Sequence, residues 1–114
     1  MALSAPATET GPEDHLRMVE NAQEAAEFLK AISHEGRLMI LCHLVTGEKS
    51  VGELERLLSA RQAAVSQQLS RLRAEGLVVP RREGKTIFYS LADNRPRKVL
   101  GLLYDLFCED GGAI

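Results

Sequence analysis

Aromatic residues and cysteines are scarce in this 114-residue chain. It has no tryptophan, two tyrosines, three phenylalanines and two cysteines, although 45% of its residues are hydrophobic. Few aromatics beside an ordinary apolar content are typical of a mostly helical protein. The length suits a single domain with a small core, so that burial of further apolar surface in a dimer is plausible.

Long apolar runs and enzyme motifs are also missing. No apolar run approaches the roughly 20 residues that span a membrane. The first fifteen residues, MALSAPATETGPEDH, lack the charged start and apolar centre of a signal peptide. We therefore expect a cytoplasmic protein with no membrane partner. Neither a nucleophile–base arrangement nor a phosphate-binding glycine loop is evident, so we expect no enzymatic activity and no cofactor.

The chain lacks the positive net charge of many nucleic-acid-binding proteins, since its formal net charge is −2. Its charges are, however, unevenly divided. Residues 1–30 carry six acidic and two basic side chains, whereas residues 61–85 carry six basic and two acidic ones. Because the local potential attracts phosphates, this asymmetry predicts a nucleic-acid-binding face within residues 61–85.

The first half of the chain predicts a tail and two helices. Residues 1–12 are rich in small and polar residues, which predicts a disordered tail. Apolar residues then recur every three or four positions from about Glu13 to Ala31, and again from Glu35 to about Thr46, where Ser33 is the expected N-cap. The apolar positions of the first helix are Leu16, Val19, Ala22, Ala26 and Leu29, and those of the second are Leu38, Leu41, Cys42 and Val45.

Residues 51–91 predict two short helices followed by a β-hairpin. The first helix starts near Val51, with Ser50 as its cap, and a turn over residues 59–61 leads to the second helix, which Gly76 ends. The strands Val78–Arg82 and Thr86–Leu91 flank the turn residues 83–85. The expected inward side chains are Leu54, Leu57 and Leu58 on the first helix, Val65, Leu69 and Leu72 on the second, and Ile87, Tyr89 and Leu91 on the hairpin. This order is that of a winged helix-turn-helix, which places its second helix in the major groove of DNA.

The last predicted helix has more apolar residues than one small core can cover. It begins after Asp93 or Asn94, with Pro96 in its first turn, where proline is tolerated. Its apolar residues are Val99, Leu100, Leu102, Leu103, Leu106 and Phe107. We therefore predict a mainly α fold with a small β-hairpin over residues 13–110, and a homodimer formed through the first and last helices.

The second helix of the helix-turn-helix offers short polar side chains near its start. A helix in the major groove needs such side chains to reach base edges, and glutamine pairs bidentately with adenine. Basic residues further along the helix and on the wing suit phosphates or the minor groove. The predicted DNA-binding residues are Gln62, Ala63, Ser66, Gln67, Arg71, Arg81, Arg82 and Lys85. A winged helix used for protein contact is a further interpretation, which a salt-insensitive interaction would support.

Several segments together resemble the ArsR/SmtB family of bacterial repressors. They are Leu29–His34 (LKAISH), Arg37-Leu38, Ala64–Leu69 (AVSQQL), Gly76–Val78 (GLV) and Arg82–Lys85 (REGK). The resemblance covers about residues 25 to 110. It implies a dimeric winged helix-turn-helix that binds an imperfect inverted repeat and leaves it when an inducer arrives. It also implies base-reading roles for Gln62, Ala63, Ser66 and Gln67.

The metal sites of that family are incomplete in this chain. Ser50 and Gly52 stand where one type of site has cysteines. The frame of the second type reads Asp93, Arg95, Leu106 and Glu109, which keeps two carboxylates but no histidine. Carboxylates alone are poor ligands for zinc, nickel or cobalt, so we predict no metal site. The alternative is a metal- or metalloid-responsive repressor that uses Cys42, Cys108 and an unidentified third ligand.

Cys42 and Cys108 remain as the candidate residues that respond to the inducer. Each alone is readily explained as a small buried hydrophobe, and an intracellular chain with two cysteines seldom carries a structural disulfide. The pair resembles that of the sulfide- or persulfide-responsive (BigR/SqrR-type) branch of the family. This resemblance implies that the two helices run close together and form a dithiol, which reactive sulfur species convert to a disulfide or a longer sulfur bridge. The expected partners are an operator with an inverted repeat, a second copy of the chain and a persulfide or polysulfide inducer.

Overall fold

The computed structural model describes residues 12–59 and 62–108. The predicted tail lies outside these residues except for Pro12, which begins the first helix. In chain order the elements are α1 (Pro12–Ile32), α2 (Glu35–Val45), β1 (Lys49–Ser50), α3 (Val51–Leu58), α4 (Gln62–Ala74), β2 (Val78–Glu83), β3 (Thr86–Leu91) and α5 (Arg95–Phe107). The predicted fold class, a mainly α winged helix-turn-helix, is confirmed.

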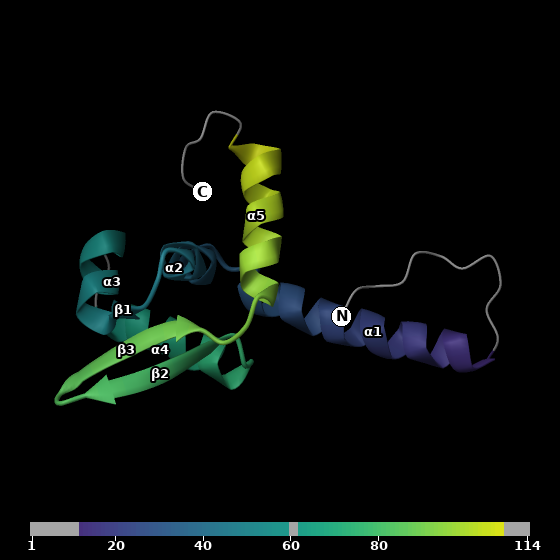
Figure 1. Ribbon diagram of the computed structural model, residues 1–114, viewed down its shortest axis with the longest axis horizontal. Coiled ribbons are helices and arrows are strands. Elements are labelled where there is room, and N and C mark those ends of the chain that lie inside the picture. The colour runs from purple at the N-terminus through teal and green to yellow at the C-terminus, as the bar shows by residue number, and fades with distance from the viewer. Residues whose placement is uncertain (1–11, 60–61, 109–114) are drawn as a thin grey trace.

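The body of the molecule consists of α2, α3, α4 and the sheet (Figure 1). Helix α2 contacts α1, α3, α4, α5 and β3, so it occupies the centre of the fold. The predicted inward face of α4 is confirmed, since Val65, Leu69 and Leu72 are all buried. The rest of the buried apolar core is Ala31, Ile32, Ile40, Leu41, Leu44, Leu54, Leu77, Val78, Tyr89 and Leu100. Burying a leucine side chain stabilises a fold by roughly 1.5–3 kcal/mol, so these contacts hold α4 against α2, α3 and the sheet.

The sheet has three antiparallel strands in the order β1-β3-β2. The predicted hairpin is confirmed, and Glu83 pairs with Thr86 across its turn. Gly84 has a φ of +63°, a left-handed conformation that favours glycine. The inward direction of Tyr89 is also confirmed, because this side chain is buried. The short strand β1, where Ser50 pairs with Phe88, was not predicted, since a strand of two residues has no period of its own.

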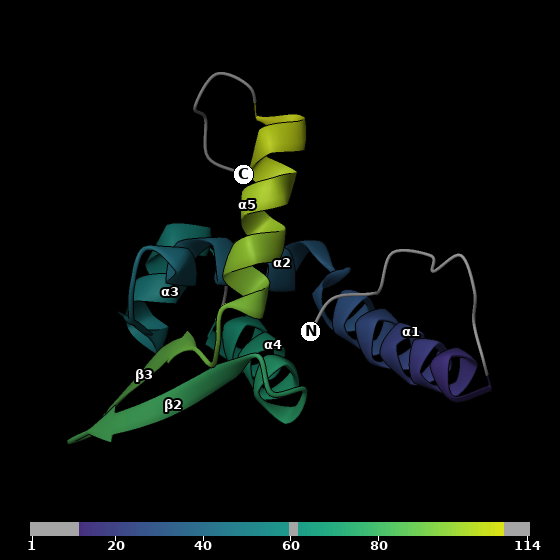
Figure 2. The ribbon, with the colours of Figure 1, turned by 45° about the vertical axis from the view of Figure 1, so that its right-hand side comes forward.

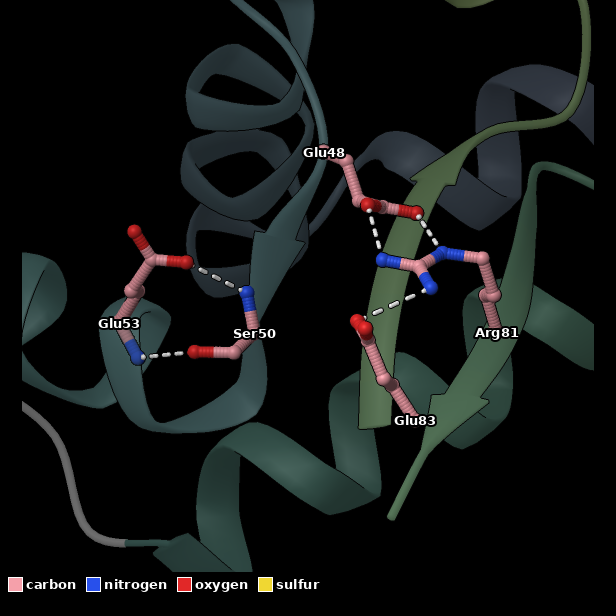
Figure 3. Close-up of polar contacts among 5 residues, drawn as sticks. All are labelled: Glu48, Ser50, Glu53, Arg81 and Glu83. Atoms are coloured by element: carbon pink, nitrogen blue, oxygen red, sulfur yellow. Dashed lines mark hydrogen bonds and ion pairs between the residues drawn. The ribbon is translucent and has the colours of Figure 1, made fainter. Parts of the chain in front are cut away.

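The N-terminus of α3 is capped as predicted, whereas that of α2 is not. Ser50 and Glu53 form a reciprocal capping box at α3, in which each side chain accepts a hydrogen bond from the other residue's backbone N–H (Figure 3). The cap of α2 is His34, whose Nδ1 accepts a 3.0 Å hydrogen bond from the Gly36 N–H. The prediction of Ser33 was wrong because its hydroxyl donates to the carbonyl of Lys30 at the end of α1.

Two predicted buried faces differ from those observed. The fully buried residues of α2 are Ile40, Leu41 and Leu44, whereas the predicted Leu38, Cys42 and Val45 are only half-buried. Because α2 packs against other elements on several sides, it buries residues on more than one side of the helix. The prediction of one buried face therefore left out Ile40 and Leu44. On α3, Leu57 was predicted to point inward but is 50% exposed.

Helices α1 and α5 extend away from the body in different directions (Figures 1 and 2). The predicted apolar stripe of α1 is largely exposed, and the buried residues of the helix are Ala31 and Ile32 at its C-terminal end and the polar Asn21 in its middle. On α5, Leu100 is buried while Leu102, Leu106 and Phe107 are exposed, the last by 75%. None of the helices in the described residues is long and apolar enough to cross a membrane.

Candidate DNA-binding face and dithiol

Helix α4 presents a polar face on the side away from its buried residues. Ala63, Gln67 and Arg71 are exposed, and Ser66 is half-buried. Gln62 begins the helix, and its side chain lies outside the described part of the structure. Arg71 pairs with Glu75 one turn later, with 3.4 Å between the Nε and carboxylate atoms. The predicted reading residues that are described therefore share one accessible helical surface.

Gln68 connects α4 to the junction of α1 and α2. Arg37 Nη1 donates a 3.2 Å hydrogen bond to Gln68 Oε1, and His34 Nε2 lies 3.5 Å from Gln68 Nε2. The Arg37 guanidinium also donates to the carbonyls of Lys30 and Ala31 at the end of α1. We assigned no role to Gln68 from the sequence because nothing distinguishes it from its polar neighbours on α4.

The three basic residues of the wing have different surroundings. Arg82 and Lys85 are exposed, and among the described residues they have no ion-pair or side-chain hydrogen-bond partner. Arg81 instead binds Glu48 through two hydrogen bonds, of 2.9 Å from Nε and 2.8 Å from Nη2, and Glu83 through one of 3.2 Å from Nη1 (Figure 3). These bonds raise the pKa of Arg81 and lower that of Glu48. Glu48 has no local sequence signal that predicts this pairing.

Cys42 on α2 and Cys108, which follows the last residue of α5, are both free and half-buried. Burial raises the pKa of Cys42, and negative charge on Cys108 raises it further. Charge on Cys108 therefore acts on the Cys42 thiol, although sixty-six positions separate the two residues in the sequence. Helices α2 and α5 are in contact, and Arg97 Nη1 donates a 2.7 Å hydrogen bond to the Val45 carbonyl at the end of α2.

No group of three or more histidine, cysteine, aspartate or glutamate side chains suited to a metal ion occurs among residues 12–59 and 62–108. Asp93 accepts hydrogen bonds from the backbone and side chain of Arg95, which lower its pKa. Glu109 lies outside the described residues. The described residues therefore provide no third metal ligand beside Cys42 and Cys108, which the metal- or metalloid-responsive alternative requires.

Comparison with known proteins identifies the family. Residues 34–79 match the family described as bacterial regulatory protein, arsR family. The biofilm growth-associated repressor of Agrobacterium fabrum is 48% identical over 91 residues, which are 80% of this chain and 78% of that protein. The chain belongs to the ArsR family. The predicted family is therefore confirmed.

Solved structures of similar proteins share the fold. The transcriptional repressor BigR from Xylella fastidiosa is 45% identical, with a TM-score of 0.77 over 82% of this chain and 96% of that one. Reduced HlyU from Vibrio cholerae is 43% identical, with a TM-score of 0.76 over 81% and 97%. ArsR-family regulators bind DNA and are typically dimers. They are not enzymes, which confirms the expectation from the sequence.

Proposed function

We propose that this ArsR-family protein is a homodimeric repressor, acting in the cytoplasm, whose affinity for its operator is lowered when a persulfide oxidises Cys42 and Cys108. The observation that carries the proposal is the contact between helix α2, which carries Cys42, and helix α5, which Cys108 follows, together with the effect of Cys108 on the pKa of Cys42. Three further arguments support the proposal: the surface expected to face DNA, the chemistry of the two cysteines, and the contacts that connect the cysteines to that surface.

The DNA-facing surface combines a polar helix with a basic hairpin. Ser66 and Gln67 lie on the accessible side of α4, with Gln62 and Ala63 at the start of the same helix, so we expect these residues to reach base edges. Arg82 and Lys85 on the wing carry positive charge without a partner among the described residues, so they are available to phosphates. The operator expected for a two-fold symmetric dimer is an inverted repeat whose half-sites lie about 34 Å apart.

The dithiol chemistry follows from the environment of Cys42. Because burial and negative charge on Cys108 both disfavour the Cys42 thiolate, we assign the first attack to Cys108. The Cys108 thiolate attacks the outer sulfur of a persulfide RSSH, forms Cys108–S–SH and releases the thiol RSH. Cys42 then attacks the inner sulfur and expels hydrogen sulfide, so the two cysteines are oxidised by two electrons and the persulfide is reduced. A second RSSH that adds one more sulfur before closure gives a trisulfide and a second RSH.

A bridge between Cys42 and Cys108 has a physical path to the DNA-facing surface. It joins α5, which carries exposed Leu106 and Phe107, to α2. The other end of α2 holds α4 through the hydrogen bond from Arg37 to Gln68. A displacement of α2 relative to α5 thus changes the position of α4 relative to the dimer interface that we propose for α1 and α5. A solved structure of a relative, HlyU, is described as reduced, which supports a redox-dependent state in this family.

The decisive experiment measures DNA affinity with and without glutathione persulfide, for the wild type and for Cys42→Ser and Cys108→Ser. The DNA is a duplex selected from a random-sequence pool by the reduced wild-type protein. We expect the wild type to lose affinity by about 10- to 100-fold, the range typical of allosteric coupling, and both variants to stay bound. Mass spectrometry of the treated wild type should find one peptide pair, containing Cys42 and Cys108, joined by two or more sulfurs.

Two results would contradict the proposal. One is loss of affinity in the wild type while both thiols remain unmodified. The other is equal loss of affinity in the single-cysteine variants. If stoichiometric zinc or arsenite releases the DNA while the persulfide does not, the metal- or metalloid-responsive alternative replaces the proposal.

A further inference from the structure

Arg81 lies on the wing but is surrounded by carboxylates of its own chain. We propose that Arg81 is a positioning residue for the wing and not a phosphate contact, because it fixes the hairpin against the start of α3 through Glu48. The inference rests on the proposed DNA-binding face and assigns different roles to two adjacent basic residues, Arg81 and Arg82.

The Arg81–Glu48 contact spans the width of the sheet. Strands β1 and β2 are its outer strands, and β3 lies between them. Phe88 on β3 pairs with both Arg81 on β2 and Ser50 on β1. The Arg81 guanidinium lies over the Phe88 ring, 4.7 Å from its centroid. It also binds Glu48, which immediately precedes β1 (Figure 3). Arg81 therefore connects the far strand of the wing to the segment that enters α3.

This connection supplements a short backbone pairing. Strand β1 contributes only Lys49 and Ser50 to the sheet, and Ser50 is also the N-cap of α3. The two hydrogen bonds from Arg81 to Glu48 thus tie the wing to a residue two positions before Ser50, the first residue of the capping box. The angle between the hairpin and the helix-turn-helix depends on this tie in addition to the contacts of the core.

The geometry leaves Arg81 poorly suited to a phosphate. Its Nε and Nη2 atoms, the pair that grips a phosphate bidentately, are both bound to the carboxylate of Glu48. Glu83 accepts from Nη1, so two negative charges surround the guanidinium and repel an approaching phosphate. Arg82 points to the opposite face of β2, because successive side chains alternate along a strand, and it has none of these contacts.

Salt dependence of DNA binding separates the two roles. The observed log affinity falls with log salt concentration by about 0.9 for each neutralised phosphate. The test uses reduced protein and the selected duplex, with the variants Arg81→Gln, Glu48→Gln and Arg82→Gln. Because each subunit of the proposed dimer contributes one Arg82, we expect Arg82→Gln to reduce this slope by about 1.8. Arg81→Gln should lower affinity about 3- to 10-fold at every salt concentration and leave the slope unchanged.

Glu48→Gln supplies the matched control for charge. It raises the net charge by one, whereas Arg81→Gln lowers it by one, so long-range attraction to DNA changes in opposite directions. If Arg81 positions the wing, both variants weaken binding to a similar extent, and the double variant is no worse than either single one. Arg81→Lys keeps the charge but loses the bidentate geometry, so it should behave as Arg81→Gln does.

Stability measurements distinguish positioning from a general structural role. The pair is well exposed, at 50% and 35% of the two side chains, and exposed ion pairs contribute little to stability. The unfolding midpoints of Arg81→Gln and Glu48→Gln should therefore match the wild type. Hydrogen exchange of the wing amides should be faster in both variants and unchanged in Arg82→Gln.

The inference is overturned if Arg81→Gln reduces the salt slope of the dimer by about 1.8, one phosphate in each subunit. It is also overturned if Glu48→Gln binds DNA as tightly as the wild type or more tightly. Failure of the proposed function would look different. An unchanged salt slope in Arg82→Gln contradicts the phosphate contact that we propose for the wing. The affinities of the Arg81 and Glu48 variants still decide whether Arg81 positions the wing.

Discussion

The body of this protein and its two end helices use their apolar residues differently. In the body, Leu41, Leu54 and Leu72 are fully buried within one chain. On α1 and α5, Leu16, Leu106 and Phe107 remain exposed although they recur at helical spacing. The body thus buries its apolar residues within a single chain, whereas the end helices carry exposed apolar surface, which we propose is covered by a second copy.

The dithiol lies where these two regions meet. Cys42 belongs to α2 at the centre of the body, and Cys108 follows α5. The covalent bridge that we propose between them would constrain the end helix relative to the body and would leave the core of the helix-turn-helix intact. The difference between the regions therefore suggests why an inducer would act here: the body must stay folded, and only its relation to the end helices needs to change.

The largest expected effect is on the stability of the body. Leu54→Ala removes a fully buried side chain and should lower the free energy of unfolding by about 3 kcal/mol. Leu57→Ala is the matched control, because Leu57 lies on the same helix but is half exposed, and its effect should stay within about 0.5 kcal/mol. Urea denaturation at one protein concentration measures both. Equal losses in the two variants would show that the division into buried and exposed faces of α3 is wrong.

The second effect concerns the end helices. Phe107→Ala should raise the dissociation constant of the dimer about 30-fold, which corresponds to about 2 kcal/mol, because an exposed aromatic at an interface is a typical hot spot. Val79→Ala removes an exposed apolar side chain from the wing and should leave the dimer unchanged. Sedimentation equilibrium distinguishes the outcomes, and a wild-type protein that stays monomeric would refute the proposed interface.

The third prediction concerns the loss of stability on substitution of the N-cap of one helix in each region, α3 in the body and α5 among the end helices. Ser50→Ala removes the side chain that caps α3 and should cost about 1 kcal/mol of stability. Asn94→Ala changes the N-cap of α5, whose side chain makes no capping hydrogen bond, so it should cost less than about 0.5 kcal/mol. Thermal unfolding of both variants provides the comparison. A larger loss from Asn94→Ala than from Ser50→Ala would contradict the capping geometry.

The smallest effect is on the acidity of Cys42, the thiol on the body side of the dithiol. Burial and negative charge on Cys108 hold its pKa above that of a free cysteine, so alkylation of Cys42 should reach half its maximal rate at a higher pH than in a short peptide. Cys108→Ser removes the second cause, so the midpoint should move to lower pH while remaining above that of the peptide. Iodoacetamide labelling followed by mass spectrometry measures it. An unchanged midpoint in Cys108→Ser would argue against close thiols.

Much of the fold could be predicted because it follows from local patterns. The spacing of Val65, Leu69 and Leu72 defined the buried face of α4, and Gly76 marked its end. The cap at Ser50 and the turn at Gly84 were equally local signals. The cap of α2 was predicted wrongly as Ser33 instead of His34, because the choice depends on which hydrogen bonds the end of α1 already uses.

The candidate site was less predictable because the residues that contact one another in it lie far apart in the sequence. The sequence placed Arg81 on a basic wing, but Glu48, thirty-three positions earlier, determines what its guanidinium binds. Gln68 showed no signal until Arg37 and His34 were found beside it. Residues that act through such contacts have no periodicity to reveal them.

By itself, the sequence determined the order of helices and strands and the polar face of α4, since each depends on residues within one or two turns of each other. Only the tertiary structure decided that Cys42 has Cys108 as an electrostatic neighbour, that Arg81 is engaged by Glu48, and that the apolar residues of α1 and α5 stay exposed. These outcomes depend on which distant segments meet when the core closes, and a one-dimensional pattern does not contain the distance between side chains that folding brings together.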